Sequence, residues 1–243
     1  MWLKGEGPYT QAGPNSDILL LTTSHAPKGE HRDVTIFSGP FAFRGFWPAT
    51  PNQTWVEPLN TWGMHMVKNF PQNRAGYVKL VSNDPTDLPE INFRLFTENP
   101  ETDLGAMKEG IAFCRRALMR VDKPTGPLDI THPPCPAGVA KDGTCTDEDA
   151  DEDWIKSDTF GHHVTSTNPI GADDDESAVL DSNFNVRGTK GLRVVDASVF
   201  PRIPGSFPVV ATFMISEKAS EVILAGLKGE MATAPGVETK VAG

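Results

Sequence analysis

The chain has 243 residues, of which 38% are hydrophobic and 22% charged, with a net charge of −10 and a pI near 5.0. This composition is that of an ordinary soluble globular protein, and its negative charge argues against nucleic acid or an anionic membrane as the main partner. No apolar run approaches the ~20 residues of a membrane-spanning helix, and no charged leader followed by an apolar stretch opens the chain.

Four segments of the first half have the composition of β-strands. They are residues 17–24 (DILLLTTS), 34–37 (VTIF), 61–70 (TWGMHMVKNF) and 76–82 (GYVKLVS). Because short loops connect most of them, they favour an antiparallel or mixed sheet, in which the apolar run beginning at Ile18 is a buried strand. Residues 38–60 are rich in Pro, Phe and Trp without clear periodicity, which indicates an irregular segment packed over a pocket.

A helix follows these strands. Asn99 is placed to cap it, Pro100 suits its first turn, and acidic residues suit its positive end. Apolar side chains then recur at steps of three and four residues, as a core-facing stripe requires: Leu104, Met107, Ile111, Cys114 and Leu118. The helix is expected to end before Pro124, and residues 124–150 have the composition of a loop.

The cysteines and the acidic clusters give weaker expectations. Cys114 is expected to be a buried thiol, whereas Cys135 and Cys145 bracket a Pro/Gly-rich loop and either close it as a disulfide or stay reduced. The clusters at residues 146–153 (TDEDADED) and 172–177 (ADDDES) are expected to be solvated loops rather than metal sites. A single sequon at Asn52 tilts the expected location toward the extracellular side, although one sequon arises easily by chance.

The pattern of apolar and polar residues changes after Trp154, where we expect a second structural part. Residues 191–201 (GLRVVDASVFP) read as a buried strand that runs into a turn, and a helix follows from Pro208, where a missing N–H costs nothing. One face of this helix is apolar: Ala211, Ile215, Ala219, Val222, Ile223 and Leu227. The residues from Gly229 onward are expected to be a flexible tail.

Two adjacent histidines, His162 and His163, precede the run VTSTNPIG. A histidine suits proton transfer because its pKa lies near neutrality. A zinc site built from this pair and nearby aspartates is a poor alternative, since adjacent side chains point in different directions. A Ser–His hydrolase is also a poor alternative, since the sequence contains no Gly-x-Ser-x-Gly elbow.

Five stretches together resemble the C-terminal part of the glucose-methanol-choline (GMC) flavin oxidoreductases. They occur in the family's order: residues 2–13 (WLKGEGPYTQAG), 71–96 (PQNRAGYVKLVSNDPTDLPEINFRLF), 162–171 (HHVTSTNPIG), 182–205 (SNFNVRGTKGLRVVDASVFPRIPG) and 207–224 (FPVVATFMISEKASEVIL). The resemblance implies an α/β (α+β) fold. A mixed or antiparallel sheet with covering helices would form the substrate-binding domain, followed by a strand–turn–helix piece of an incomplete FAD-binding Rossmann-like domain.

The resemblance also implies a division of labour along the chain. Residues 1–155 would be a partial substrate-binding domain, residues 156–228 the end of the FAD-binding domain with the catalytic histidine, and residues 229–243 the tail. The family's opening Gly-x-Gly-x-x-Gly motif, which seats the pyrophosphate of FAD on a helix, is absent from these 243 residues. We therefore expect the N-terminal FAD-binding part to come from the same polypeptide or from a partner chain.

The resemblance places the reacting groups as well. His163 takes the position of the catalytic base, and a one-residue gap would give that position to His162 instead. Backbone N–H groups at Asp196 and Ala197 would contact the phosphate-ribityl part of FAD. Phe207, Pro208 and Val209 at the start of the final helix would contact FAD, and the helix would direct its positive end at the flavin ring.

One position departs from the family pattern. Phe207 stands where the family commonly has Asn or His as a second polar group, and phenylalanine can neither accept nor donate a proton. Either Arg202, His162 or Ser206 supplies that group, or the small-molecule substrate needs only one; Arg202 would suit an acidic or polarised substrate.

The leading hypothesis is an FAD-dependent oxidoreductase that oxidises an alcohol, an aldehyde or a related CH–OH donor. The alternatives are a lyase or decarboxylase of the same fold, and a catalytically silent binding module. On its own the 243-residue chain is expected to be colourless and prone to aggregate, since its sheet edge and helix faces would be exposed.

Overall fold

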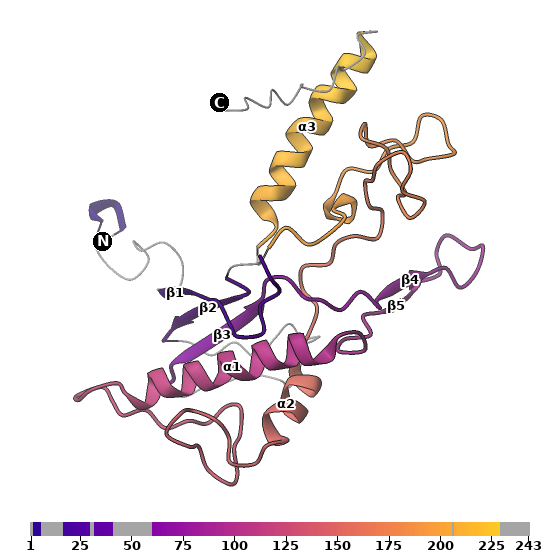
Figure 1. Cartoon of the computed structure of the whole chain (residues 1–243). Coiled ribbons are helices and arrows are strands. Elements are labelled where there is room, and N and C mark those ends of the chain that lie inside the picture. Colours follow the sequence, from indigo (N-terminus) through magenta and orange to yellow (C-terminus); the bar gives the residue numbers. More distant parts are fainter. Residues whose placement is uncertain (1, 6–16, 30–31, 41–59, 206, 229–243) are drawn as a thin grey trace, which may run out of the picture. The chain divides into compact units, whose positions relative to one another are not determined.

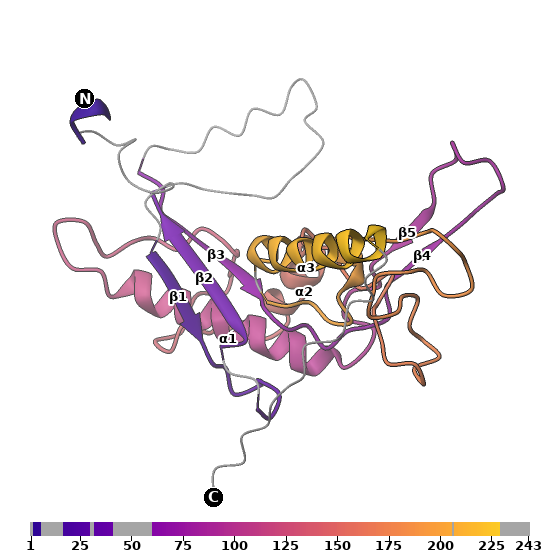
Figure 2. The same ribbon diagram turned by 90° about the horizontal axis from the view of Figure 1, so that it is seen from above.

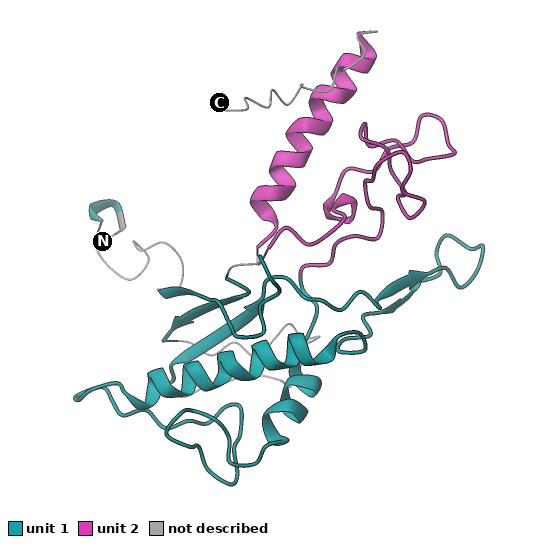
Figure 3. Ribbon diagram, in the orientation of Figure 1, with its two compact units in different colours: residues 1–162 teal, residues 163–243 magenta. Residues whose placement is uncertain are grey.

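The computed structural model describes residues 2–5, 17–29, 32–40, 60–205 and 207–228. The chain separates into two compact units, residues 1–162 and 163–243, each with a hydrophobic core of its own (Figure 1, Figure 3). Four subjects of the sequence analysis lie outside the described residues: most of the stretch 2–13, most of the segment 38–60 with its sequon, Ser206, and the tail from Gly229.

The first unit contains a three-stranded antiparallel sheet in the order β1-β2-β3. Strand β1 is Asp17–Leu21, β2 is Val34–Gly39 and β3 is Gly63–Lys68, after a short 3-10 helix at Trp2–Lys4. Ile36 of the central strand lies opposite Leu19 on one side and Met66 on the other. The three predicted strands are therefore confirmed, and they pair in an antiparallel sheet as expected.

Helix α1, Pro100–Met119, covers one face of this sheet (Figure 2). The predicted stripe is confirmed, because Leu104, Ile111 and Cys114 are all buried. Strand residues Val34 and Ile36 are fully buried against this helix. The expected side-chain cap is wrong: Asn99 adopts a left-handed conformation and its side chain makes no cap hydrogen bond, although its carbonyl accepts one from the N–H of Thr102.

Strand β1 is less buried than predicted. Ile18 and Leu20 keep 66% and 48% of their surface, whereas Leu19 and Leu21 pack into the core. The reason is that β1 is an edge strand with α1 on one face only, so alternate side chains point away from the core.

A separate two-stranded hairpin joins β4, Tyr77–Lys79, to β5, Glu90–Asn92. The first of these strands was predicted within residues 76–82, and the second was not predicted. Several large apolar side chains of the hairpin are exposed: Val78, Leu80, Val81, Leu88 and Ile91.

A buried polar network fastens the sheet to the beginning of α1. The carboxylate of Asp33 is fully buried and accepts hydrogen bonds of 2.8 and 2.7 Å from the N–H and hydroxyl of Thr23. Lys68 lies between Asp33, at 3.5 Å, and Asp103, at 4.0 Å. Asp103 also accepts from the N–H of Gln72 at 3.0 Å, so each buried carboxylate has several partners.

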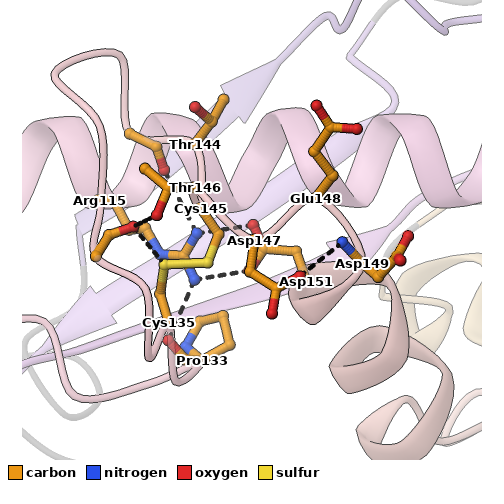
Figure 4. The surroundings of a disulfide bond; sticks show 12 residues. Arg115, Pro133, Cys135, Thr144, Cys145, Thr146, Asp147, Glu148, Asp149 and Asp151 are labelled. Carbon is orange, nitrogen blue, oxygen red and sulfur yellow. Dashed lines mark hydrogen bonds and ion pairs between the residues drawn. A yellow bond between two sulfur atoms is a disulfide. The ribbon is translucent and has the colours of Figure 1, made fainter.

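The loop that follows α1 is closed by a disulfide between Cys135 and Cys145, which resolves the pairing left open above (Figure 4). Arg115 of α1 holds this loop, donating to the carbonyls of Pro133 at 3.1 Å and Gly143 at 3.4 Å. Gly143 packs so closely that an added Cβ would lie 2.0 Å from the carbonyl oxygen of Ala112, a position that only glycine can occupy.

The acidic cluster at residues 146–153 is not the solvated loop that we predicted. Its second half forms the start of helix α2, Ala150–Asp158, and Asp151 is buried. Both carboxylate oxygens of Asp151 accept hydrogen bonds of 2.7 Å from the two terminal nitrogens of Arg115 (Figure 4). The error arose because the guanidinium that recruits Asp151 comes from another helix, 36 residues earlier in the chain.

The second unit contains a 3-10 turn η3, Ala197–Val199, and helix α3, Val209–Leu227. The predicted helix is confirmed, but the predicted strand at residues 191–201 is wrong, because only isolated bridges such as Asn185–Arg193 form there. The apolar residues of this stretch fill the core without a continuous neighbouring strand to pair with. The buried members of that core are Leu180, Phe184, Val199 and Ala219.

Helix α3 buries little of its surface. Of its predicted core face, Ala219 and Val222 are buried, while Leu227 is 80% exposed. Other apolar side chains of the helix are exposed too: Val209, Val210, Phe213, Met214 and Leu224. Among the helices in the described part of the chain, none is long and apolar enough to cross a membrane.

Candidate active site around His163 and the start of helix α3

The segment that carries His163 runs beside the turn η3. The N–H of Asn168 donates to the carbonyl of Ser198, and the N–H of Ile170 donates to the carbonyl of Val199, both at 3.0 Å. Further along, an added Cβ on Gly171 would lie 2.5 Å from the side chain of Ala178, so the close approach there requires glycine. These contacts fix the course of the segment within the second unit.

Side chains reinforce the same contact. The amide nitrogen of Asn168 donates to the hydroxyl of Ser198 at 3.0 Å, and that hydroxyl donates to Asp196 Oδ1 at 2.5 Å. The same carboxylate oxygen accepts from the N–H of Ser198 at 2.8 Å. Asp196 therefore caps η3 with its side chain, which gives this aspartate a local structural task.

His163 lies against the residue that precedes α3. The ring of His163 meets the ring of Phe207 edge to face, with centroids 5.4 Å apart and planes inclined by 65°. Pro208 is the next residue and the N-cap of α3, and no side chain of the described residues makes a cap hydrogen bond there. Val209 and Val210, which open the helix, are 60% and 79% exposed.

The structure thus brings an imidazole to the residues beside a helix N-terminus. A helix start carries partial positive charge because its first N–H groups have no partner within the helix, and it stabilises nearby negative charge by about 0.3–1 kcal/mol. A neutral imidazole can accept a proton, and its apolar neighbour Phe207 does not compete for it. The arrangement suits a reaction in which a proton leaves and negative charge develops near the helix.

Between His163 and Asn168 the chain makes a costly turn. Ser166 has a φ of 72°, in the left-handed region, and its hydroxyl lies 3.0 Å from that of Thr165. A non-glycine residue in this conformation costs about 1–2 kcal/mol, so its neighbours must hold it there.

The other predicted site residues are placed as follows. His162 belongs to the first unit, where its ring stacks on Phe160 at 6.2 Å. Arg202 is exposed in the turn after η3, and Ala197 is half-buried within η3. Ser206 lies outside the described residues. Within the described part of the chain no group of three or more His, Cys, Asp or Glu residues could hold a metal ion.

Asn168 and Ser198 were missed by the sequence analysis. The signal for Ser198 was present, because Asp-x-Ser is a pattern in which the carboxylate takes up the serine N–H and hydroxyl. Nothing local pointed to Asn168, whose partner lies 30 residues away.

Comparisons with known proteins identify the family of the chain. The family model described as GMC oxidoreductase matches residues 71–216, which include His163, η3 and the start of α3. An oxygen-dependent choline dehydrogenase of Vibrio vulnificus is 35% identical over 163 residues, covering 66% of this chain and 27% of that protein. A 5-(hydroxymethyl)furfural oxidase of a Methylovorus species is 30% identical over 193 residues, covering 75% of this chain and 36% of its own length.

A solved structure of formate oxidase from Aspergillus oryzae shares the fold. It superposes with a TM-score of 0.60 and 24% identity, covering 84% of this chain and 33% of the formate oxidase. The mixed α/β architecture with small antiparallel sheets is therefore that of known oxidoreductase structures. The chain spans between about a quarter and a little over a third of the length of these relatives.

Proposed function

Because this chain belongs to the GMC oxidoreductase family, we propose that it carries the substrate-side part of the active site of an FAD-dependent oxidoreductase. The family is flavin-dependent, and its members include proteins named for oxidising choline and 5-(hydroxymethyl)furfural. The observation that carries the proposal is the contact of the His163 ring with Phe207, the residue before the N-cap of α3.

The proposed substrate is an alcohol, an aldehyde hydrate or a related CH–OH donor. Its oxidation removes one proton from the hydroxyl and one hydride from the carbon, which leaves a carbonyl product. His163 would take the proton as a general base, a role worth about 10²- to 10⁴-fold in rate. Bound FAD would supply the two-electron acceptor for the hydride.

The residues of the second unit fit such a cofactor. The start of α3 has no side-chain cap among the described residues, and its first two valines are exposed, which supports a role for its N–H groups in binding an electronegative group. In the proposal, Pro208 and Val209 lie against the flavin ring, and the backbone around Asp196 and Ala197 faces the phosphate-ribityl part. The Asp196 carboxylate is already used by Ser198, which supports a backbone contact rather than a side-chain contact.

Phe207 narrows the chemistry. It fills the position of a second polar group with an apolar ring that packs on His163. The second polar group beside the substrate would therefore be Arg202, His162 or Ser206. If none of these side chains contacts the substrate, the substrate would have to react with His163 as the only proton-transfer group. Arg202 would favour a polarised or acidic donor, because its guanidinium forms charge-assisted hydrogen bonds.

The N-terminal FAD-binding part is proposed to come from the same polypeptide or from a partner chain. Residues 1–155 would then serve as the substrate-binding domain and residues 156–228 as the end of the FAD-binding domain. In this proposal the 243-residue chain purifies without flavin, because it contains no Gly-x-Gly-x-x-Gly motif to seat the pyrophosphate.

The test uses the flavin-loaded protein that contains both parts, kept free of oxygen. Addition of primary alcohols and aldehydes should bleach the oxidised flavin band, and the donor should appear as the corresponding carbonyl or acid. A lyase or decarboxylase would convert its substrate with no net bleaching, and a silent module would leave both flavin and donors unchanged. Either of these outcomes would refute the redox proposal.

A further inference from the structure

We propose that Asn168 and Ser198 are positioning residues for His163. They would hold the segment of the base against the turn that carries Asp196 and Ala197. The inference rests on the proposed function, because it assigns the side chains that orient the proposed base. It concerns contacts within the second unit alone.

Three hydrogen bonds join the two segments at this point. Two are backbone bonds, from Asn168 to Ser198 and from Ile170 to Val199, at 3.0 Å each. The third joins side chains, from the Asn168 amide to the Ser198 hydroxyl, also at 3.0 Å. The side-chain bond, added to the two backbone bonds, fixes the orientation of the base segment relative to η3 as well as the distance between them.

The Ser198 hydroxyl is fully oriented by its neighbours. Its proton is directed to Asp196 Oδ1 at 2.5 Å, which turns its lone pairs toward the donor on Asn168. A single hydroxyl thus connects the base segment to the carboxylate that caps η3. Removal of this hydroxyl would release Asn168 and weaken the cap together.

The strained turn at Ser166 shows why such an anchor is needed. Ser166 lies between His163 and Asn168 with a φ of 72°, a conformation that persists only when its surroundings hold it. On one side the chain is held by Ser198, and on the other the His163 ring packs on Phe207. Loss of the first anchor would let the turn relax and carry the imidazole away from the start of α3.

A second Asp-x-Ser pair in the same unit serves as a matched control. Asp175 Oδ1 accepts from the N–H of Ser177 at 2.9 Å and from its hydroxyl at 2.6 Å, which is the local geometry of Asp196 and Ser198. Within the described residues, the Ser177 side chain bonds only to Asp175. Ser177→Ala therefore removes the same local bond and leaves the bond between Asn168 and Ser198 in place.

The test is an NMR spectrum of the histidine rings in the flavin-loaded protein that contains both parts, without substrate. The signals of the His163 ring are identified by their loss in His163→Gln. Phe207→Leu then gives the chemical shift of these signals without the neighbouring aromatic ring. Ser198→Ala should move the His163 signals most of the way to that position. Ser198→Thr, which keeps the hydroxyl, and Ser177→Ala should leave them at the wild-type position.

Two results would overturn the proposal: unchanged His163 signals in Ser198→Ala, or an equal displacement in Ser177→Ala. If Ser198→Ala loses its helical circular dichroism, the His163 signals of Asn168→Ala are compared with those of the wild type and Phe207→Leu instead. Asn168→Ala keeps the backbone bonds and removes only the side-chain bond. The spectrum is recorded without turnover, so it tests the positioning of His163 separately from the proposed oxidation. Unchanged His163 signals in Ser198→Ala would refute the positioning proposal even when donors reduce the flavin. Displaced signals would support it even when no donor does.

Discussion

The imidazole of His163 and the phenyl ring of Phe207 meet edge to face, 5.4 Å between centroids, at the residue before Pro208. Phe207 is 53% exposed, so it is available to shield one side of the imidazole while its own outer surface stays open. A polar side chain at this position would add a second proton-transfer group, whereas the phenyl ring restricts the motion of the first. The contact therefore links the one departure from the family pattern to the position of the proposed base.

Replacement of this ring should weaken the second unit. Phe207→Leu removes the edge-to-face contact but keeps an apolar side chain, and it should lower the free energy of unfolding by about 0.5–1.5 kcal/mol. Urea denaturation followed by circular dichroism measures the change. Phe213→Leu on the same unit is the control, since Phe213 is 69% exposed on α3, and a loss as large as that of Phe207→Leu would argue against a specific ring contact.

The buried pair of Arg115 and Asp151 should dominate the stability of the first unit. Asp151→Ala leaves a fully buried guanidinium without its carboxylate, and it should cost about 3–5 kcal/mol in urea denaturation. The double variant Arg115→Met/Asp151→Leu should recover part of that loss, because no buried charge remains although the carbonyls of Pro133 and Gly143 lose their donor.

Another ion pair of helix α2 provides the contrast. Glu152 and Lys156 form an i,i+4 pair at 2.6 Å, but Lys156 is exposed and Glu152 is only partly buried. Lys156→Ala should therefore leave the denaturation midpoint almost unchanged. An effect comparable to that of Asp151→Ala would contradict the distinction between buried and exposed pairs.

The carboxylate of Asp33 should make the first unit sensitive to acid. Burial by itself would raise the pKa of Asp33, but the hydrogen bonds from Thr23 and the charge of Lys68 outweigh burial and hold that pKa below its ordinary value. The ionised form therefore favours the folded state. Its contribution is present above the ordinary pKa of 3.8 and is lost as the pH falls through the lowered value of the folded protein.

The matching experiment replaces the hydroxyl donor. Thr23→Val should raise the pKa of Asp33 and lower the free energy of unfolding at neutral pH, by about 1–3 kcal/mol for a lost bond to a buried charge. The difference between the variant and the wild type should shrink at a pH below the Asp33 pKa, where the carboxyl is neutral in both. Thr86→Val removes a similar hydroxyl from Asp84 in an exposed turn, and an equal effect there would be evidence against burial as the cause.

The cysteines should react in three distinct steps. Burial raises the pKa of the Cys114 thiol to about 12, while Cys135 and Cys145 are paired. A thiol reagent at neutral pH should therefore react with no thiol in the native chain, with one thiol after denaturation without reductant, and with three thiols after denaturation and reduction. Cys114→Ser should remove the middle step. Three thiols in the denatured, unreduced chain would show that the disulfide is not formed.

Local rules predicted the parts of the fold that local sequence determines. The three- and four-residue spacing from Leu104 to Cys114 predicted the buried face of α1, and the proline before Val209 marked the start of α3. The proximity of His163 to the residues before α3 was expected from the family resemblance rather than from periodicity.

Two of the misses, at Asp151 and Asn168, share one physical cause, which is a partner distant in sequence, and the third has a different cause. Asp151 looked like part of a solvated acidic run because its guanidinium partner is on α1. The apolar stretch at residues 191–201 looked like a strand because burial and pairing give the same pattern over a short run. Asn168 carried no local signal at all, since its only specific feature is the hydroxyl of Ser198.

The most direct test of the account is the rate of flavin reduction by an oxidisable donor in the flavin-loaded protein, measured without oxygen for two neighbouring variants. His163→Gln should slow reduction by about 10²-fold or more, because the proton acceptor is lost while a similar shape remains. His162→Gln should stay within about tenfold of the wild type, since even a lost neutral hydrogen bond contributes only about 0.5–1.5 kcal/mol. Wild-type rates in His163→Gln, or the larger loss in His162→Gln, would contradict the assignment of His163 as the base.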